Sequence, residues 1–350
     1  MANTPLVSVL MAVRNGMPYI RQAVESLLRQ TMQDWELIIA DDGSTDETPS
    51  YLRSLTDSRV RYFPVEGGYI AARNFTLRTA QSPLAAVLDA DDVALPERLQ
   101  CQYRFLQEHP ECVLVGAQVE DIDPEGRPLR RREFPLGDEA LRWRLFFGSP
   151  FIHPSTMFRR QAALECGAYR PQFPQAEDYD LFSRLAEHGR LANLPQCLLR
   201  YRVHPEAVTV KRLDPHLRDS ANAVAEYARR HVPEVDPGAV RDLYYFLCVD
   251  RDPVETSAWA VAEAYRQIRA GYLAHRPEPG EELRQEIGRL EQVLRWRCVE
   301  RAERLFWRRP LRAWRWLRLA GRFDPQEGTL SRILLRALKK RFQTNTPKAI

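Results

Sequence analysis

Two acidic clusters stand directly after apolar segments that have the composition of buried strands. Asp41 and Asp42 follow the run LIIA, and Asp89, Asp91 and Asp92 follow the run AAVL. Adjacent carboxylates repel one another, so holding them together costs free energy unless a cation or a bound ligand compensates. Their hard oxygen atoms suit Mg²⁺ or Mn²⁺ shared with a diphosphate. A single D-x-D is a weak signal, but two clusters at predicted strand ends favour a metal and phosphate site.

A third acidic pair, Glu177-Asp178, stands at the start of a helix predicted over residues 178–188. Carboxylates at a helix N-terminus complement the free backbone N–H groups and the helix dipole, so the pair could be a structural cap. A carboxylate held on a rigid helix could also act as a general base. The two interpretations are compatible, because capping is one way to hold a carboxylate in place.

The elements that must position these carboxylates alternate between strand and helix over the first hundred residues. Apolar patterns predict strands at residues 6–12, 35–40, 60–63 and 84–88, with helices between them at residues 20–28, 49–55 and 69–80. This alternation indicates an α/β fold with a mostly parallel sheet covered by helices on both faces. Ligands of such sheets bind beyond the carboxyl ends of the strands, where both acidic clusters fall.

The pattern changes after residue 100 and again after about residue 214. The middle segment predicts a helix at 96–109, strands at 113–119, 155–158 and 198–203, and a polar loop at 123–128. Helical stripes then dominate: Leu294, Cys298, Ala302 and Leu305; Ala313, Trp314, Leu317 and Ala320; Leu330, Ile333, Leu334 and Leu338. We predict a catalytic domain over residues 1–213, with halves 1–105 and 106–213, and an all-α region over residues 214–350.

The motifs in the first domain resemble those of the family 2 glycosyltransferases, which have the GT-A fold. The resemblance runs in order through PLVSVLMAVRNG, AVESLLRQTMQDWELIIADDGSTDET, GGYIAARNFTL, VLDADD, PERLQ, FIHPSTMFRR, EDYDLFSRL and YRVH, over about residues 4–210. It implies a Rossmann-like GT-A domain of the bacterial cell-surface polysaccharide type. It also implies an inverting hexosyl- or N-acetylhexosaminyltransferase that uses a nucleotide-sugar donor, most often a UDP-sugar.

The resemblance assigns donor contacts to residues that follow the first two strands and to one arginine. Asp42 would hydrogen-bond the nucleotide base, and the backbone around Ala12 to Arg14 would line the base pocket. Arg73 would approach the diphosphate, because guanidinium geometry suits phosphate oxygens. Relatives often carry an aromatic residue in place of Arg14, so stacking on the base is not implied here.

The resemblance places the divalent ion, Mn²⁺ or Mg²⁺, at the D-x-D. Asp91 would hold the ion, and Asp89 or Asp92 would contact the ribose or belong to the coordination shell of the metal. His204 in YRVHPEAVT stands where some relatives use a histidine as a metal or phosphate ligand, and a surface loop histidine is the alternative.

Asp178 would be the catalytic base of the implied reaction. It would take the proton of the acceptor hydroxyl as that oxygen attacks the anomeric carbon opposite the leaving nucleotide, with Glu177 orienting the base or the acceptor. His153 stands on the acceptor side, where structural support of its loop is the alternative role. A Q-x-x-R-W motif does not follow YRVH, which argues for the addition of single sugars to a glycan, lipid-linked or protein-linked acceptor.

The charge of the chain is uneven. The net charge is +4, yet residues 301–350 hold fourteen Lys or Arg and three Asp or Glu. The segment EQVLRWRCVERAERLFWRRPLRAWRWLRLA carries nine arginines and four tryptophans. Basic helices with interfacial aromatics can lie on anionic membranes, and a helical subdomain that packs Trp and Leu while exposing Arg is the alternative. Nucleic acid is not an expected partner, because no recognised binding module is present.

Two further features concern the compartment. No apolar run approaches the roughly 18 residues that span a bilayer, and the short N-terminal apolar run is typical of a first strand rather than a secretion signal. The six cysteines are scattered, as expected of reduced packing residues. We therefore expect a cytoplasmic enzyme, with peripheral attachment to the inner face of the membrane as an option.

Other functions fit less well. A nucleotidyltransferase would carry a Gly/Arg/Lys-rich phosphate loop near the N-terminus, and VLMAVRNGMP is not one. Neither G-x-G-x-x-G nor G-x-x-x-x-G-K-[ST] is present, which excludes the usual dinucleotide and P-loop enzymes. A non-catalytic nucleotide-sugar binder or scaffold would be expected to have lost metal ligands or base, yet Asp89, Asp91 and Asp178 are all present.

Overall fold

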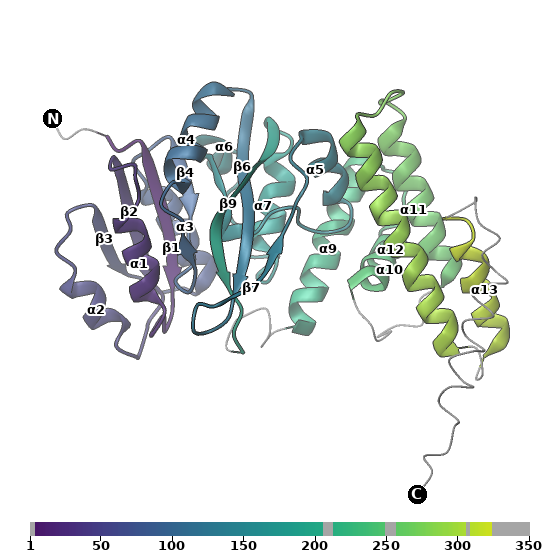
Figure 1. The fold of residues 1–350 in the computed structure, drawn as a ribbon, viewed down its shortest axis with the longest axis horizontal. Helices are drawn as coiled ribbons and strands as arrows, with labels where there is room; N and C mark the ends of the chain where they lie inside the picture. The colour runs from purple at the N-terminus through teal and green to yellow at the C-terminus, as the bar shows by residue number, and fades with distance from the viewer. Residues whose placement is uncertain (1–3, 206–212, 249–256, 306–308, 324–350) are drawn as a thin grey trace, which may run out of the picture. The chain divides into compact units, whose positions relative to one another are not determined.

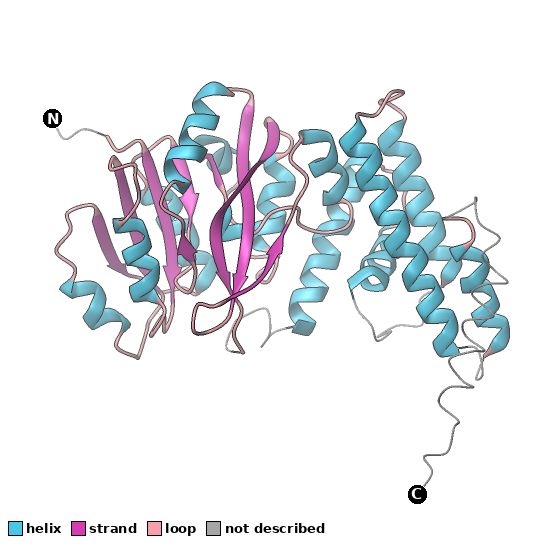
Figure 2. Ribbon diagram, viewed as in Figure 1, coloured by secondary structure: helices cyan, strands magenta, loops and turns pink. Residues whose placement is uncertain are grey.

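The computed structural model describes residues 4–205, 213–248, 257–305 and 309–323. The chain divides into two compact units, Met1–Ala223 and Val224–Ile350, and helix α9 (Leu213–His231) crosses this division. In the described part of the chain, all strands belong to the first unit, whereas the second unit is helical (Figures 1 and 2). The predicted stripe from Leu330 to Leu338 lies outside the described residues.

Four parallel strands form the N-terminal half of the sheet. They lie in the order β3-β2-β1-β4, with bounds Val60–Pro64, Trp35–Asp41, Val7–Val13 and Leu84–Val87. All residues of β1, β2 and β4 are buried, as their continuous apolar sequences predict for strands covered on both faces.

The sheet continues beyond β4 through strands from the second half of the unit. The order is β4-β8-β6-β9-β5, with bounds Met157–Arg159, Cys112–Ile122, Arg190–Arg202 and Val93–Ala94 for the last four, and β7 (Pro128–Arg132) pairs with β6. Strand β8 is antiparallel to both β4 and β6, so β6 runs in the same direction as β4, and β9 is parallel to β6. The carboxyl ends of β1, β2, β3, β4, β6 and β9 therefore meet at one edge, which confirms the mostly parallel α/β fold.

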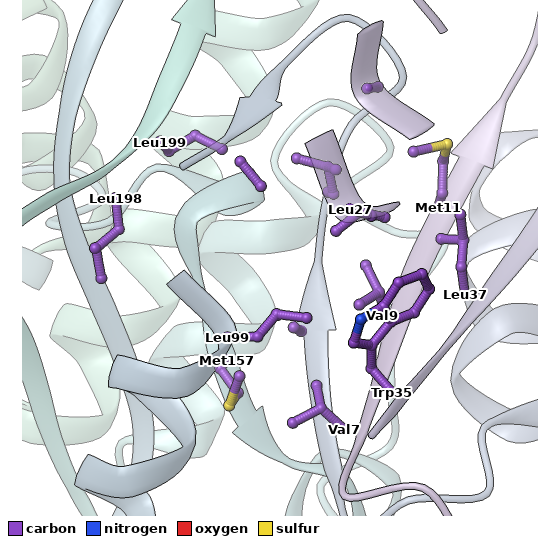
Figure 3. Packing of buried hydrophobic residues seen from close by; sticks show 14 of the residues in the cluster. Val7, Val9, Met11, Leu27, Trp35, Leu37, Leu99, Met157, Leu198 and Leu199 are labelled. Atoms are coloured by element: carbon purple, nitrogen blue, oxygen red, sulfur yellow. The ribbon is translucent and has the colours of Figure 1, made fainter. Parts of the chain in front are cut away.

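Helices cover both faces of this sheet. Their bounds are Ile20–Leu28 (α1), Thr48–Ser54 (α2), Tyr69–Thr79 (α3), Arg98–Glu108 (α4), Asp138–Leu145 (α5), Arg160–Glu165 (α6) and Glu177–Leu185 (α7). On one face, alternate residues of β1 pack with α1 and α4, as Figure 3 shows for Val7, Val9, Met11, Leu27 and Leu99. On the other face, a small patch of Ala12, Ala40 and Ala72 lies between β1, β2 and α3. Because these side chains are only methyl groups, α3 can approach the sheet closely.

In its described residues, the second unit consists of the end of α9 and four further helices. These are α10 (Pro237–Cys248), α11 (Ala258–Leu273), α12 (Glu281–Leu305) and α13 (Pro310–Ala320). The predicted stripes are largely buried, except that Leu305 is only half-buried and Trp314 is 46% exposed. None of the described helices is long and apolar enough to cross a membrane. None of the six cysteines forms a disulfide.

Candidate functional site

The loop that follows β1 is tied to the loop that follows β2. The backbone N–H of Asn15 donates to Ser44 Oγ at 2.8 Å, and the Thr45 N–H donates to Asn15 Oδ1 at 2.8 Å. Arg14 is exposed, with its guanidinium 4.0 Å from the Asp42 carboxylate. The segment from Ala12 to Arg14 therefore lies beside Asp42, as a shared base pocket would require.

The two acids at the end of β2 have different surroundings. Asp41 is held by the Ser44 N–H at 2.9 Å and the Tyr62 hydroxyl at 3.1 Å, so it stabilises the turn. Asp42 accepts a hydrogen bond of 3.0 Å from the N–H of Gly68, just before α3. Gly68 has a φ of 86° and a ψ of 173°, a conformation that is almost restricted to glycine.

Arg73 on α3 is the buried cation of the site. Its guanidinium lies 3.0 Å from Asp89 Oδ1 and 3.4 Å from Glu177 Oε1, and it also donates to the Tyr69 hydroxyl. The methyl-lined contact of α3 with the sheet brings this side chain to the carboxyl edge. Arg73 thus joins the acidic cluster after β4 to the N-terminus of α7, two segments separated by almost ninety residues.

Asp91 and His204 form a second pair at this edge. His204 follows β9, and its Nε2 lies 3.0 Å from Asp91 Oδ2, while its buried Nδ1 has no hydrogen-bond partner among the described residues. The Asp91 side chain is 34% exposed, so one side of the carboxylate is open. Because β4 and β9 run in the same direction, residues after the two strands meet at one edge of the sheet.

Asp92 faces the protein interior. It is 1% exposed, and its Oδ1 accepts a 2.8 Å hydrogen bond from the Arg202 N–H. Burial and the nearby charges of Asp91 and Asp89 raise the pKa of Asp92 well above its ordinary value. We therefore separate Asp92, whose contacts are internal, from Asp89 and Asp91.

Arg202 is a further residue of the site that the sequence did not single out. Its buried guanidinium donates to the carbonyl of Asp91 at 2.8 Å, to the carbonyl of Pro124 at 2.8 Å and to Gln22 Oε1 at 2.6 Å. One arginine thus connects the turn after β4 to the loop after β6 and to helix α1. The sequence feature that could have indicated its role is its position in the YRVH motif, two residues before His204.

The acidic pair of α7 combines one buried and one accessible carboxyl group. Glu177 is 7% exposed, and burial raises its pKa to about 8, although the charge of Arg73 opposes the shift. Asp178 is half-buried in the first turn of α7 and accepts a 2.7 Å hydrogen bond from the Tyr179 N–H. The N-cap residue of α7 is Ala176, and no side chain makes a capping hydrogen bond there, so the acidic pair is not the cap that the sequence suggested. Burial also raises the pKa of Asp178. A partly accessible carboxylate with a raised pKa is suited to accept a proton near neutral pH.

His153 lies behind this pair. Its Nε2 is 2.9 Å from the Tyr169 hydroxyl, and its ring contacts the ring of Phe182. Burial lowers the pKa of His153 well below its ordinary value, and the charges of Arg73 and Arg98 act in the same direction. The imidazole is therefore neutral, and its contacts are those of loop support.

The segment before α7 is anchored by α9, which the resemblance did not reach. The Gln175 carbonyl lies 2.6 Å from His216 Nδ1, and the Gln175 N–H donates to Asp219 Oδ2 at 3.2 Å. The charge of His216 also acts on the Asp178 carboxyl group. These contacts arise from tertiary packing, so no local sequence motif predicts them.

The residues present fit a divalent cation whose coordination would be completed by a bound donor. Within the described ranges, no three His, Cys, Asp or Glu side chains form a ready-made metal cluster. Mg²⁺ and related ions are usually held by one or two carboxylates together with substrate phosphates and waters. Asp91 and His204, whose Oδ2 and Nε2 lie 3.0 Å apart, would hold such an ion together with the phosphates of a donor.

The sequence is similar to several proteins with recorded roles. The profile of "Glycosyl transferase family 2" matches residues 8–167. The O-antigen biosynthesis glycosyltransferase WbnJ of Escherichia coli is 33% identical over 206 residues, which are 57% of this chain and 80% of WbnJ. The amylovoran biosynthesis glycosyltransferase AmsE of Erwinia amylovora is 28% identical over 236 residues, covering 65% of this chain and 85% of AmsE.

Solved structures share the fold. TarS of S. aureus, residues 1–349 in complex with UDP-GlcNAc, has a TM-score of 0.55 at 15% identity and covers 92% of both chains. The mannosyltransferase PcManGT from Pyrobaculum calidifontis, in complex with GDP-Man and Mn²⁺, has a TM-score of 0.53 at 17% identity and covers 93% of this chain and 89% of its own. With the sequence relatives and the site at the strand edge, these findings identify the chain as a glycosyltransferase of family 2.

Proposed function

We propose that this glycosyltransferase moves a single sugar from a nucleotide-sugar to an acceptor hydroxyl with inversion of the anomeric configuration. The observation that carries the proposal is the contact of Arg73 with both Asp89 and Glu177. This contact brings Asp89 of the D-x-D and Glu177 of α7 to one guanidinium, which supports a donor and an acceptor meeting between the two segments. The biosynthetic roles of WbnJ and AmsE support an acceptor in cell-surface glycan synthesis.

The donor would bind along the carboxyl edge of the parallel strands. Asp42 accepts hydrogen bonds from the nucleotide base, with the Ala12 to Arg14 backbone beside it, and Arg73 contacts the diphosphate. A divalent cation held by Asp91, with Asp89 and His204 beside it, would supply charge stabilisation for the departing diphosphate. Mn²⁺ suits the imidazole better than Mg²⁺ does, and the Mn²⁺ complex of PcManGT supports the same choice.

Asp178 would act as the general base. Its half-buried carboxylate takes the proton of the acceptor hydroxyl while that oxygen attacks the anomeric carbon from the face opposite the nucleotide. Glu177 beside it, in contact with Arg73, orients the base and the acceptor. His153 and Tyr169 support the wall behind them. A single displacement of this kind inverts the configuration without a covalent enzyme intermediate.

The nucleotide is proposed to be UDP. The fold neighbour TarS is in complex with UDP-GlcNAc, whereas PcManGT is in complex with GDP-Man, so the fold alone accommodates both bases. A test is to measure the unfolding temperature of the protein with UDP, dTDP and GDP, each with Mn²⁺ or with chelator. UDP with Mn²⁺ should give the largest stabilisation. If GDP raised the unfolding temperature more than UDP did, the donor would be a GDP-sugar instead.

The catalytic assignment is tested by nucleotide release from a panel of UDP-, dTDP- and GDP-sugars. We expect metal-dependent release from one donor, and a loss of at least about a hundredfold in Asp178→Asn with the nucleotide affinity unchanged. The matched control is Glu187→Gln, an exposed acid beyond the other end of α7. Full release by Asp178→Asn would remove Asp178 from the base role. A protein that no nucleotide stabilises would instead be a non-transferring scaffold.

A further inference from the structure

The helical unit contains a cationic cavity that the proposed reaction does not use. It lies between the N-terminal end of α11 and helix α13, and its volume is about 510 Å³. Its lining includes four arginines and two tryptophans: Arg312, Arg315, Arg318, Arg322, Trp259 and Trp316. Among the described residues, no Asp or Glu contributes to this lining. The first turn of α11 also lacks acidic residues, so its N-terminal dipole adds to the positive potential.

The arginines of α13 occupy one side of the helix. Arg315, Arg318 and Arg322 are three and four residues apart, all are exposed, and no described side chain forms a hydrogen bond or an ion pair with them. Like charges at these spacings destabilise a helix. The cluster therefore costs folding free energy that an external anion would relieve.

Large apolar side chains are exposed beside these cations. Leu311 is 80% exposed and stands four residues before Arg315, so it continues the arginine stripe by one turn. Trp314 is 46% exposed and stands four residues before Arg318, and Trp259 of the cavity rim is 73% exposed. Arginines interleaved with exposed Trp and Leu are typical of helices that lie in the interface of a membrane.

We propose that this surface, formed by Trp259 of α11 and by Leu311, Trp314, Arg315, Arg318 and Arg322 of α13, docks the protein on a bilayer that contains anionic phospholipids. Lipid phosphates contact the arginines in and around the cavity, and the three apolar side chains enter the boundary between headgroups and acyl chains. A soluble anion would satisfy the arginines but would leave Leu311 and Trp259 in water. The bilayer removes both the charge repulsion and the exposed apolar area, so it matches the surface better.

The test is cosedimentation of the full chain with vesicles of phosphatidylcholine alone or mixed with phosphatidylglycerol. Wild type should bind the mixed vesicles, and R315Q/R318Q/R322Q should bind them at least tenfold more weakly. The control R284Q/R289Q/R304Q removes the same charge from α12, where each arginine pairs with a glutamate, and should retain most of the binding. Equal loss in both variants would reduce the effect to net charge and overturn the proposal.

A second set of measurements tests the apolar part of the surface. Leu311→Gln, at a largely exposed position, should weaken binding severalfold without lowering the unfolding temperature. The blue shift of tryptophan emission on vesicle binding should shrink in W259F/W314F. Equal binding to neutral vesicles, no vesicle binding at all, or full competition by inorganic phosphate or a single-stranded oligonucleotide would overturn the proposal. Stabilisation by UDP, measured on the same samples, tests the proposed transferase function separately.

Discussion

At the scale of single residues, the site is governed by an excess of carboxyl groups over cations. Arg73 is buried and lies near Asp89, Glu177 and Asp178, so one positive charge faces three acids. Burial raises the pKa of all three carboxyl groups, and the charge of Arg73 opposes the shift in each. Neighbouring carboxylates raise the pKa of Asp89 and Glu177 further. The protein without ligand thus keeps a site that a cation and a donor would complete.

Replacement of Arg73 by lysine tests this arrangement. An ammonium group is a single point charge and cannot contact Asp89 and Glu177 on two sides as the guanidinium does. We expect Arg73→Lys to lose about one charge-assisted contact, which is worth about 1.4 kcal/mol. This loss corresponds to nucleotide binding that is about tenfold weaker. Calorimetric titration with UDP and Mn²⁺ measures the change. Arg78→Lys, at an exposed position on the same helix, is the control and should bind as wild type does.

Glu177 should give the stability of the protein an unusual pH dependence. Its pKa is about 8 in the folded protein and near 4.5 when exposed, so its contribution to stability is fully present below pH 4.5 and is lost as the pH rises through 8. The difference corresponds to at most about 5 kcal/mol, at about 1.4 kcal/mol for each unit. Denaturant titrations should show Glu177→Gln more stable than wild type at pH 8.5 and no more stable at pH 5. An equal difference at both values would contradict the assignment.

At the scale of elements, the position of α3 depends on a turn that almost only glycine can adopt. Gly68 has a φ of 86°, and its N–H is held by Asp42 at 3.0 Å. Gly68→Ala should therefore cost about 1–3 kcal/mol of stability and weaken nucleotide binding, because the strain is relieved by moving the amide away from Asp42. Chemical denaturation and nucleotide titration measure the two effects.

The control for this substitution lies in α12. A Cβ added to Gly288 meets no atom within 4 Å, and this residue is inside a helix. Gly288→Ala should stabilise the protein by about 0.5–1 kcal/mol, because alanine loses less backbone entropy in a helix. If both substitutions had the same sign, backbone conformation would not be the cause of the first effect.

The elements differ in how far the sequence predicts them. Strands β1 to β4 agree with the predicted ranges within one or two residues. Three of them, β1, β2 and β4, are fully buried apolar runs, which leave a continuous pattern in the sequence. Strand β9 begins at Arg190 rather than near residue 198, since its pairing with β6 is interrupted by register shifts and its sequence contains Pro195. Strand β7 is PLRRR and mostly exposed, so it has no apolar pattern, and helices α5 and α6 were also missed.

The site shows the same division between local and tertiary information. The sequence predicted the acids at the strand ends, because strand direction alone brings them to one edge of the sheet. The sequence could not separate Asp92 from Asp89 and Asp91, since the burial of Asp92 depends on the Arg202 amide from a distant strand. The role of Arg202 also depends on contacts with residues that are distant in the sequence, such as Asp91 and Gln22.

At the scale of the whole molecule, α9 links the two units, because the division falls within it. Its first turns hold the segment before the proposed base through His216 and Asp219, which contact the backbone of Gln175. His216 and Asp219 belong to the first unit, so the first turns of α9 support the N-terminal end of α7 within that unit.

The double variant H216A/D219A tests this link. The single variant His216→Ala loses the His216 charge alone, which should raise the pKa of Asp178 further and move the acid limb of the kcat profile to higher pH. Loss of the Gln175 contacts should lower kcat severalfold with nucleotide affinity unchanged, because the base is less well placed while the donor edge is untouched. His188→Ala, an exposed histidine beyond the other end of α7, should leave both quantities as in wild type. An unchanged pH profile in His216→Ala, together with an unchanged kcat in the double variant, would show that α9 supports the fold alone.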